Sequence, residues 1–361
     1  LRTSPIPVCS IFVRCVPARM SSEQDPSAES LALVARLRSR FRGALLGLAV
    51  GDALAASVQF SRPGSFAPVR DLLGGGPFDL PRGAWSDDTA LSLALARSLL
   101  DRGFCDASDQ RERFCRWQRE GEGSATGECL GITASVARAL SAGVPDATMA
   151  DGADALVRTA PLAMFRFGDE RRLLEDVNGM AGVTSHEPET VEAVRDFALV
   201  LGTALAGRHA PLEMHAVRRT GEVNEAARVL ALATQAVADT TSWKQAVLQV
   251  VNQGGDADVV AAVCGQLAGA IYGIEAIPLA WRAALVQRET IEETIAFAKP
   301  IPLHDVTVQI NTLLPKTPQM EIWEREGSKW GRLVNESTDE KSFWEPTFVP
   351  WGLEPEDLIA Y

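Results

Sequence analysis

The sequence has few aromatic residues and no cluster of basic residues. Aromatics make up only 6% of the 361 residues, so Ala and Leu must fill much of the interior. This disfavours an aromatic-rich β-sandwich, while 46% hydrophobic and 23% charged residues disfavour intrinsic disorder. The 35 basic and 47 acidic residues give a net charge of -12. Because such a chain repels a phosphate backbone, nucleic acid is not expected as a partner.

Paired cysteines and long apolar runs are also lacking. None of the six cysteines belongs to a Cys-x-x-Cys pair: Cys9, Cys15, Cys105, Cys115, Cys129 and Cys264. A disulfide scaffold or structural zinc site is therefore not expected, and a reducing compartment, the cytoplasm, is predicted. The uncharged run Gly43–Gly51 is far shorter than the roughly 20 residues of a membrane span. No membrane contact is expected.

The first 22 residues contain Arg2, Arg14 and Arg19 but no acidic residue. An Arg-rich, acid-poor stretch is typical of an organellar targeting sequence. Translated upstream sequence ahead of a start at Met20 is the alternative interpretation. Residues 1–30 are assigned to a disordered, targeting or upstream extension outside the folded domain.

Helical periodicity begins near residue 31 and persists to residue 299, which predicts a compact, multi-helix, all-α domain over residues 31–300. Prolines and glycines interrupt it at 61–84, which predicts a loop. No run of alternating β-branched residues predicts a strand. Helices are expected at 31–58, from Ser86 to beyond Leu99, and at 107–119, 128–142, 152–166, 189–206, 224–238, 242–251 and 257–272.

Two of the predicted helices carry a stripe of small residues. A spacing of four joins Gly43, Gly47 and Gly51 in the first helix, and Ala261, Gly265 and Gly269 in the last. Residues four apart share one face, and a bare face lets another helix approach closely. The two helices are therefore predicted to pack within about 8 Å of each other or of a common neighbour.

The helical period is lost after Lys299. Residues 301–361 hold four of the eight tryptophans among prolines and charges: Trp323, Trp330, Trp344 and Trp351. We predict an irregular C-terminal extension whose indoles pack on the domain, because an indole buries a large area with a single donor to satisfy. A carbohydrate-stacking surface is the alternative.

The first acidic motif is Trp85-Ser86-Asp87-Asp88-Thr89, at a predicted helix start. Adjacent carboxylates project about 100° apart around a helix axis, so this pair could serve two ions. Capping is the alternative, since Ser at the N-cap and acids in the first turn are what a helix terminus favours.

The second acidic motif is Gly254-Gly255-Asp256-Ala257-Asp258. Paired glycines allow the backbone to bend sharply while both carboxylates converge on one point. A capped helix after a turn is again the alternative. Four carboxylates brought together would repel one another, and two divalent cations would neutralise them. Oxygen ligands of this kind suit Mg²⁺ or Mn²⁺ rather than zinc.

The two acidic motifs and several further segments occur in the order that the ADP-ribosylglycohydrolase family has them. The sequence therefore resembles this family, which includes dinitrogenase reductase-activating glycohydrolase. The resembling segments are Phe41–Leu54, Trp85–Thr89, Arg158–Leu162, Gly254–Asp258, Ala268–Gly273, Ile277-Pro278 and Trp281. The resemblance implies an all-α domain with two Mg²⁺ or Mn²⁺ ions. It also implies cleavage of an N- or O-glycosidic bond at the anomeric carbon of ADP-ribose, in an ADP-ribosylated protein or an ADP-ribose derivative.

Carried over by position, the resemblance assigns roles to eight side chains. The implied metal ligands are Ser86, Asp87, Asp88, Asp256 and Asp258, and the implied catalytic residues are Asp87, Asp256 and Gln59. Asp154 and His186 are the implied substrate-binding residues. For His186 a structural role is the favoured interpretation, because the sequence offers it no partner.

Three departures from the family pattern concern this site. Gln59 stands where the family has Glu and cannot take up a proton as a carboxylate can. Val259 stands where the family has a Thr hydroxyl. Asp151-Gly152-Ala153-Asp154 replaces the family's Asn-Gly-Asn-Gly.

Three functions follow as hypotheses. The first is a metal-dependent ADP-ribosyl hydrolase. The second is a weakened family member that binds ADP-ribose or Mg²⁺ as a sensor or partner protein. The third is a structural, crystallin-like protein, which would have no reason to retain four repelling carboxylates.

Overall fold

The computed structural model describes residues 28–142, 153–208 and 224–295, and two short strands at 331–333 and 348–350. The four tryptophans of the C-terminal segment and residues 1–27 of the predicted N-terminal extension lie outside the described residues. The strands β1 (Gly331–Leu333) and β2 (Phe348–Pro350) pair antiparallel, with Arg332 opposite Val349. They were not predicted, since three residues are too few to show an alternating pattern.

The prediction of an all-α domain is confirmed. Residues Arg36–Lys299 form one compact unit. The helices are α1 (Ala28–Ala55), α2 (Asp87–Arg102), α3 (Ala107–Glu120), α4 (Ala134–Ala142), α5 (Asp154–Val157), α6 (Thr159–Phe165), α7 (Glu170–Ala181), α8 (Pro188–Leu205), α9 (Glu225–Ala238), α10 (Trp243–Val251), α11 (Ala257–Tyr272), α12 (Leu279–Ala284) and α13 (Arg288–Thr294). Three short 3₁₀ turns are η1 (Ala56–Val58), η2 (Gly76–Phe78) and η4 (Ile274–Ala276).

Two predicted helices have wrong extents, and α7, α12 and α13 were not predicted. The stretch expected at 152–166 is split at Arg158 into α5 and α6, and Pro161, which has no N–H to donate, lies in the first turn of α6. The helix α7 was missed, although Asp169 caps it by accepting the N–H of Arg172. The helix expected at 128–142 begins only at Ala134, and the residues before it line the site described below.

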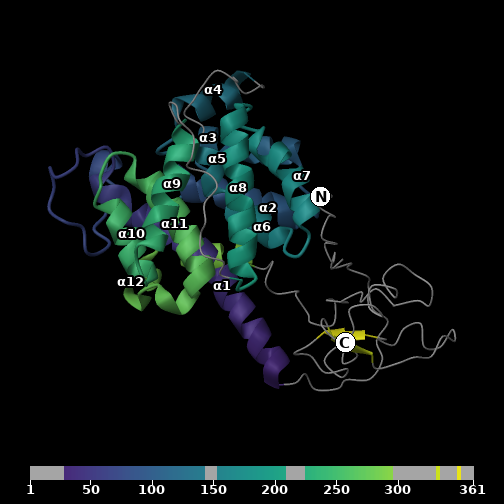
Figure 1. The fold of residues 1–361 in the computed structure, drawn as a ribbon. Coiled ribbons are helices and arrows are strands. Elements are labelled where there is room, and N and C mark those ends of the chain that lie inside the picture. Colours follow the sequence, from purple (N-terminus) through teal and green to yellow (C-terminus); the bar gives the residue numbers. More distant parts are fainter. Residues whose placement is uncertain (1–27, 143–152, 209–223, 296–330, 334–347, 351–361) are drawn as a thin grey trace, which may run out of the picture. The chain divides into compact units, whose positions relative to one another are not determined.

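The helix α11 lies at the centre of the helical unit and packs against α8, α9 and α10 (Figure 1). Every residue from Ala257 to Ala270 is buried. A helix that is apolar on all sides belongs in a core. Its position places the acidic residues at its N-terminus inside the unit rather than on the surface.

The two small-residue stripes lie directly against each other. A Cβ built on Gly43 would come within 2.3 Å of the Gly269 carbonyl oxygen, and one on Gly47 within 2.3 Å of the Gly265 oxygen. Further along, a Cβ on Gly51 would meet the oxygen of Ala261 at 2.2 Å. The backbones of α1 and α11 are therefore in contact, as the stripes predicted, and this contact places the end of α1 beside the start of α11.

We expect Gly47→Ala to destabilise the domain by about 1–3 kcal/mol or more, because its methyl group would overlap backbone that cannot retreat. Gly179→Ala is the control, since nothing lies within 4 Å of a Cβ on Gly179 in α7. This control should gain about 0.5–1 kcal/mol from helix propensity. Urea denaturation measures both changes. Equal midpoints for Gly47→Ala and wild type would contradict the close packing.

One described helix is long and apolar enough to cross a membrane by length and composition alone. It spans Ala32–Val58, and 89% of its most apolar window is buried inside the domain. A buried share this large is typical of a helix in the core of a folded domain.

Candidate active site

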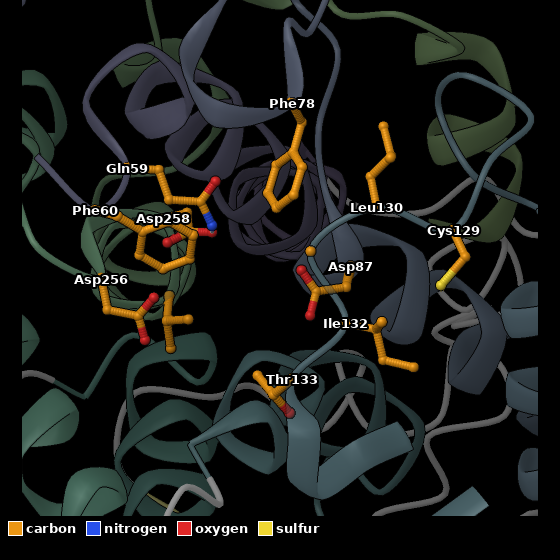
Figure 2. A pocket seen from close by; sticks show the side chains of 12 residues that line it. Gln59, Phe60, Phe78, Asp87, Cys129, Leu130, Ile132, Thr133, Asp256 and Asp258 are labelled. Atoms are coloured by element: carbon orange, nitrogen blue, oxygen red, sulfur yellow. The ribbon is translucent and has the colours of Figure 1, made fainter. Parts of the chain in front are cut away.

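A cavity of about 440 Å³ opens where five segments of the chain meet (Figure 2). Gln59 and Phe60 directly follow η1, and Phe78 belongs to η2. The remaining lining residues are Asp87 from the start of α2, Cys129–Thr133 from the segment before α4, and Asp256, Asp258 and Val259 from the start of α11. The sequence places these segments up to about 200 residues apart, and the fold joins them.

The structure brings the two acidic motifs together at this cavity. Asp87 faces Asp256 and Asp258 across it (Figure 2). Asp88 is buried beside them and is repelled by Asp87 and by both aspartates of α11. Each pair lies at a helix N-terminus, where the macrodipole partly offsets the negative charge.

Burial and mutual repulsion raise the pKa of every aspartate in this cluster. Desolvation, followed by repulsion from Asp52, raises the pKa of Asp87 to about 8. Desolvation is also the main cause that raises the pKa of Asp88 and Asp258 well above the ordinary range, with repulsion from neighbouring aspartates next. The pKa of Asp256 is raised by desolvation and by repulsion from Glu225. Without a cation, these carboxylates cannot all be ionised at neutral pH.

Asp52, in the last part of α1, holds the start of α2, and the sequence analysis did not single it out as a site residue. Its Oδ1 accepts the Ser86 hydroxyl at 2.9 Å, and its Oδ2 accepts the Thr89 hydroxyl at 2.7 Å and the Thr89 N–H at 3.1 Å. The Ser86 N–H also donates to both oxygens. A charged residue inside an otherwise apolar segment was the signal that could have found it.

The alternative interpretation of Ser86 as a capping side chain is wrong. Ser86 occupies the N-cap position of α2, but its side chain accepts no helix N–H. Its hydroxyl donates to Asp52. The Asp52 carboxylate, rather than the Ser86 side chain, accepts the Thr89 N–H of the first turn. Since the Ser86 hydrogen is directed at Asp52, the hydroxyl oxygen keeps its lone pairs for another partner. This arrangement suits a cation ligand.

Residues 128–133 do not continue a helix because their backbone must pass close to Asp87. Gly131 has φ of 89°, and a Cβ there would come within 2.1 Å of the Asp87 Oδ1. Only glycine adopts this conformation readily and leaves room for the carboxylate. The segment therefore forms a wall of the cavity, with Cys129 and Thr133 facing it (Figure 2).

The donor atoms of the cluster suit a hard divalent cation. Asp88 Oδ2 and Asp258 Oδ1 are buried and have no hydrogen-bond partner, which is costly unless a positive charge compensates them. Over the described ranges, no three Asp, Glu, His or Cys side chains lie close enough together to enclose an ion. Mg²⁺ usually binds one or two carboxylates and keeps several waters, so the residues fit a hydrated Mg²⁺ rather than a closed cage.

Asp154, an implied substrate-binding residue, is buried at the start of α5 and does not line the cavity. Its Oδ2 accepts a hydrogen bond from Nη1 of the fully buried Arg158 at 2.6 Å. The Arg158 Nη2 donates to the Met180 carbonyl and to the Thr184 hydroxyl. The negative charge of Asp154 contributes to the raised pKa of Asp87, so the ion pair lies close behind the site.

His186, the other implied substrate-binding residue, is exposed in the segment before α8 and does not line the cavity. Its ring lies against Gly182, where a Cβ would come within 3.0 Å of the imidazole. The described structure thus does not bring it to the cavity. Asp151 and Gly152 of the altered loop lie outside the described residues.

A family model described as ADP-ribosylglycohydrolase matches residues 33–309, which is most of the chain. The chain belongs to the ADP-ribosylglycohydrolase family. It is 33% identical over 296 residues to "ADP-ribosylarginine hydrolase Tri1" of Serratia proteamaculans, covering 74% of this chain and 78% of that protein. It is 31% identical over 280 residues to "ADP-ribosyl-[dinitrogen reductase] glycohydrolase" of Rhodospirillum rubrum, covering 70% and 93%.

A solved structure supports the same family and the same all-α fold. The chain matches "ADP-ribosylglycohydrolase-related protein complex" with a TM-score of 0.63 and 36% identity, covering 73% of this chain and 98% of that one. The match therefore covers nearly the whole of that solved chain.

Two departures from the ADP-ribosylglycohydrolase pattern, Gln59 and Val259, line the cavity itself. The Gln59 amide nitrogen donates a hydrogen bond to the Asp258 Oδ2. It thus satisfies one oxygen of Asp258 in a way that a carboxylate at position 59 could not. Val259 presents methyl groups to the cavity where the family pattern has a hydroxyl, so it offers no ligand atom.

Proposed function

We propose that the protein is a metal-dependent hydrolase that releases ADP-ribose by cleaving the glycosidic bond at its anomeric carbon. One observation carries the proposal: three aspartates line one cavity of an ADP-ribosylglycohydrolase domain, and a fourth, Asp88, is buried beside them and repelled by them. A chain without need of a cation gains nothing from burying this charge. The first two relatives reported above are named for ADP-ribosylarginine and dinitrogen reductase, so an ADP-ribosylated protein, modified on arginine, is the proposed substrate.

The residues that would hold two Mg²⁺ ions, or Mn²⁺, are Ser86, Asp87, Asp88, Asp256 and Asp258. Bound there, the metal would orient the ribose hydroxyls and would hold and acidify the attacking water. The protein's own contribution begins with Asp52, whose bonds to Ser86 and Thr89 fix the first turn of α2. That turn carries Asp87 into the cavity, and Gly131 keeps the opposite wall clear of it.

The attacking water must lose a proton, and Gln59 cannot accept it. Of the carboxylates that line the cavity, Asp87 faces Asp256 and Asp258 across it (Figure 2), where it can accept a proton from a water held between them. Asp256 is the partly exposed alternative. We assign the proton-accepting role to this pair of side chains, with a lower efficiency than a dedicated glutamate would give.

A specific observation favours a second candidate, a protein that binds ADP-ribose or Mg²⁺ with little turnover. The Gln59 amide satisfies Asp258, and Val259 offers no oxygen, so the proton acceptor and one ligand of the family pattern are both replaced. A purely structural role does not account for the unpaired carboxylate oxygens of Asp88 and Asp258.

Two measurements test the proposal. Release of ADP-ribose from an ADP-ribosyl-arginine protein should require Mg²⁺ or Mn²⁺ and should fall by at least about 100-fold in Asp87→Asn. Asp101→Asn, at the exposed far end of the same helix, is the matched control and should keep full activity. Titration calorimetry of ADP-ribose with and without Mg²⁺ separates binding from chemistry. Binding without any release would favour the second candidate, and neither binding nor release would reject both.

A further inference from the structure

Phe60, at the edge of the cavity, has a backbone conformation that phenylalanine rarely adopts. Its φ is 60°. Gln59 before it has φ of -53° and ψ of 132°, and the Ser61 N–H donates to the Val58 carbonyl at 3.0 Å. These values define a type II turn with Phe60 at the third position, where glycine or asparagine is normally required. A bulky side chain there strains the backbone.

The turn is fastened to the loop that precedes Asp256. The Phe60 N–H donates to the Gly255 carbonyl at 2.6 Å, and the Gly255 N–H donates to the Ser61 carbonyl at 2.8 Å. Both bonds use backbone atoms only, so glycine at position 60 would make them equally well. The strained position is thus locked in place beside the acidic cluster, but nothing in these bonds calls for an aromatic ring.

The ring of Phe60 does not serve the hydrophobic core either. It is 60% exposed and lines the cavity beside Gln59, Asp256 and Asp258 (Figure 2). Phe78, the other phenylalanine of the cavity, is different, because it packs against the buried cluster of Ala56, Leu80 and Ala84. Strain retained at an exposed aromatic residue beside a cavity is typical of a ligand contact.

The part of the substrate that reaches Phe60 follows from the proposed function, on which this inference rests. The anomeric carbon reacts beside the aspartates, whereas the adenine is separated from it by two riboses and two phosphates. A protein substrate cannot enter a cavity of about 440 Å³, so its modified side chain approaches from the open edge. An exposed ring next to Asp256 is therefore close to the reacting end of the substrate, where the leaving group departs.

We propose that Phe60 is a substrate-contacting specificity residue whose ring stacks on the guanidinium group of an ADP-ribosylated arginine. A guanidinium is planar and cationic, and it binds aromatic faces more readily than other protein groups do. Asp256 supplies a negative charge beside the ring, whereas the nearby Glu225 is paired with Arg228. A seryl leaving group has neither a plane nor a charge and gains nothing from the ring.

The test compares arginine-linked with serine-linked ADP-ribosyl peptides in Phe60→Leu, Phe60→Gly and Phe60→Tyr. For the arginine linkage we expect kcat/KM to fall about 10-fold or more in the Leu and Gly variants and to stay within about threefold in the Tyr variant. For the serine linkage, all three should stay within about threefold of wild type. Phe104→Leu, at a 49% exposed phenylalanine outside the cavity, is the matched control.

Thermal melting gives a second readout that a structural role would move in the opposite direction. Phe60→Gly relieves the strained φ, so its Tm should equal or exceed that of wild type while arginine selectivity is lost. Equal losses for both linkages, or a lowered Tm with selectivity kept, would overturn the proposal. Equal weakening of free ADP-ribose binding would instead point to adenine stacking and would also overturn it.

Failure of the proposed function is distinguishable from failure of this inference. If the wild type hydrolyses neither linkage, dissociation constants in Mg²⁺ take the place of rates. The arginine-linked peptide should then bind more tightly than free ADP-ribose in wild type, and Phe60→Leu should remove that difference. Equal dissociation constants in wild type would overturn the role of Phe60.

Discussion

Gln59→Glu is expected to raise the rate of ADP-ribose release by about 10²- to 10⁴-fold at saturating Mg²⁺, the usual contribution of a general base. Position 59 lines the cavity next to Asp258, so a carboxylate there reaches the same space as the proposed metal ligands. The amide that now donates to Asp258 would become a proton acceptor. A rate assay on ADP-ribosyl-arginine protein measures the change.

Val259→Thr should add to this effect by supplying a hydroxyl oxygen to one metal. Each 1.4 kcal/mol of ligand energy recovered corresponds to about tenfold in the metal dissociation constant. The double variant with Gln59→Glu should therefore exceed either single variant. Gln235→Glu, on the exposed face of α9, is the control for an added charge away from the cavity. Fast turnover by wild type that the double variant does not improve would show that these two positions do not limit catalysis.

The stability of the metal-free protein is expected to fall as the pH rises from about 5 to about 8. The pKa of Asp87 in the folded protein is about 8, against an ordinary value near 4, and Asp88 and Asp258 are shifted in the same direction. Between these pH values the folded protein binds more protons than the unfolded chain, so raising the pH favours unfolding. The loss should be on the order of a few kcal/mol.

Millimolar Mg²⁺ should remove most of this pH dependence, because it neutralises the ionised aspartates and binds only the folded state. At 100 times its dissociation constant, such a ligand stabilises by about 2.7 kcal/mol. Differential scanning calorimetry at pH 5 and pH 8, with Mg²⁺ or with chelator, measures all four conditions. Identical melting curves with and without Mg²⁺ at pH 8 would argue decisively against a metal site.

The double variant Asp256→Asn/Asp258→Asn tests whether the effect comes from this cluster. It should lose the response to Mg²⁺ and be more stable than wild type at pH 8 in chelator, since two repelling charges are gone. Asp101→Asn is again the matched control, as an exposed aspartate paired with Arg113. It should retain the wild-type dependence on both pH and Mg²⁺.

Features that depend on a few neighbouring residues could be predicted from the sequence. The all-α class, most helices and the packing of α1 on α11 follow from periodicity, because residues three or four apart share a helix face. The glycine stripe of α1 predicted a close approach, and the contact of Gly47 with the Gly265 oxygen confirms it. The acidic pairs Asp87–Asp88 and Asp256–Asp258 were also visible, since each is a short motif at a helix start.

Features that depend on segments far apart in the chain were decided by tertiary structure. Asp52 is 34 residues from Ser86, and no local pattern reveals that it replaces the expected cap. The residues before α4 carry helical signals, but Gly131 is held at positive φ because its backbone must pass the Asp87 carboxylate. The same holds for Phe60, whose left-handed conformation is held by hydrogen bonds to Gly255, 195 residues further along the chain.

The sequence by itself thus determined which helices form and which acids begin them. Only the packing of α1, α2 and α11 decided which charges meet, because repulsion, desolvation and backbone clashes act through space rather than along the chain.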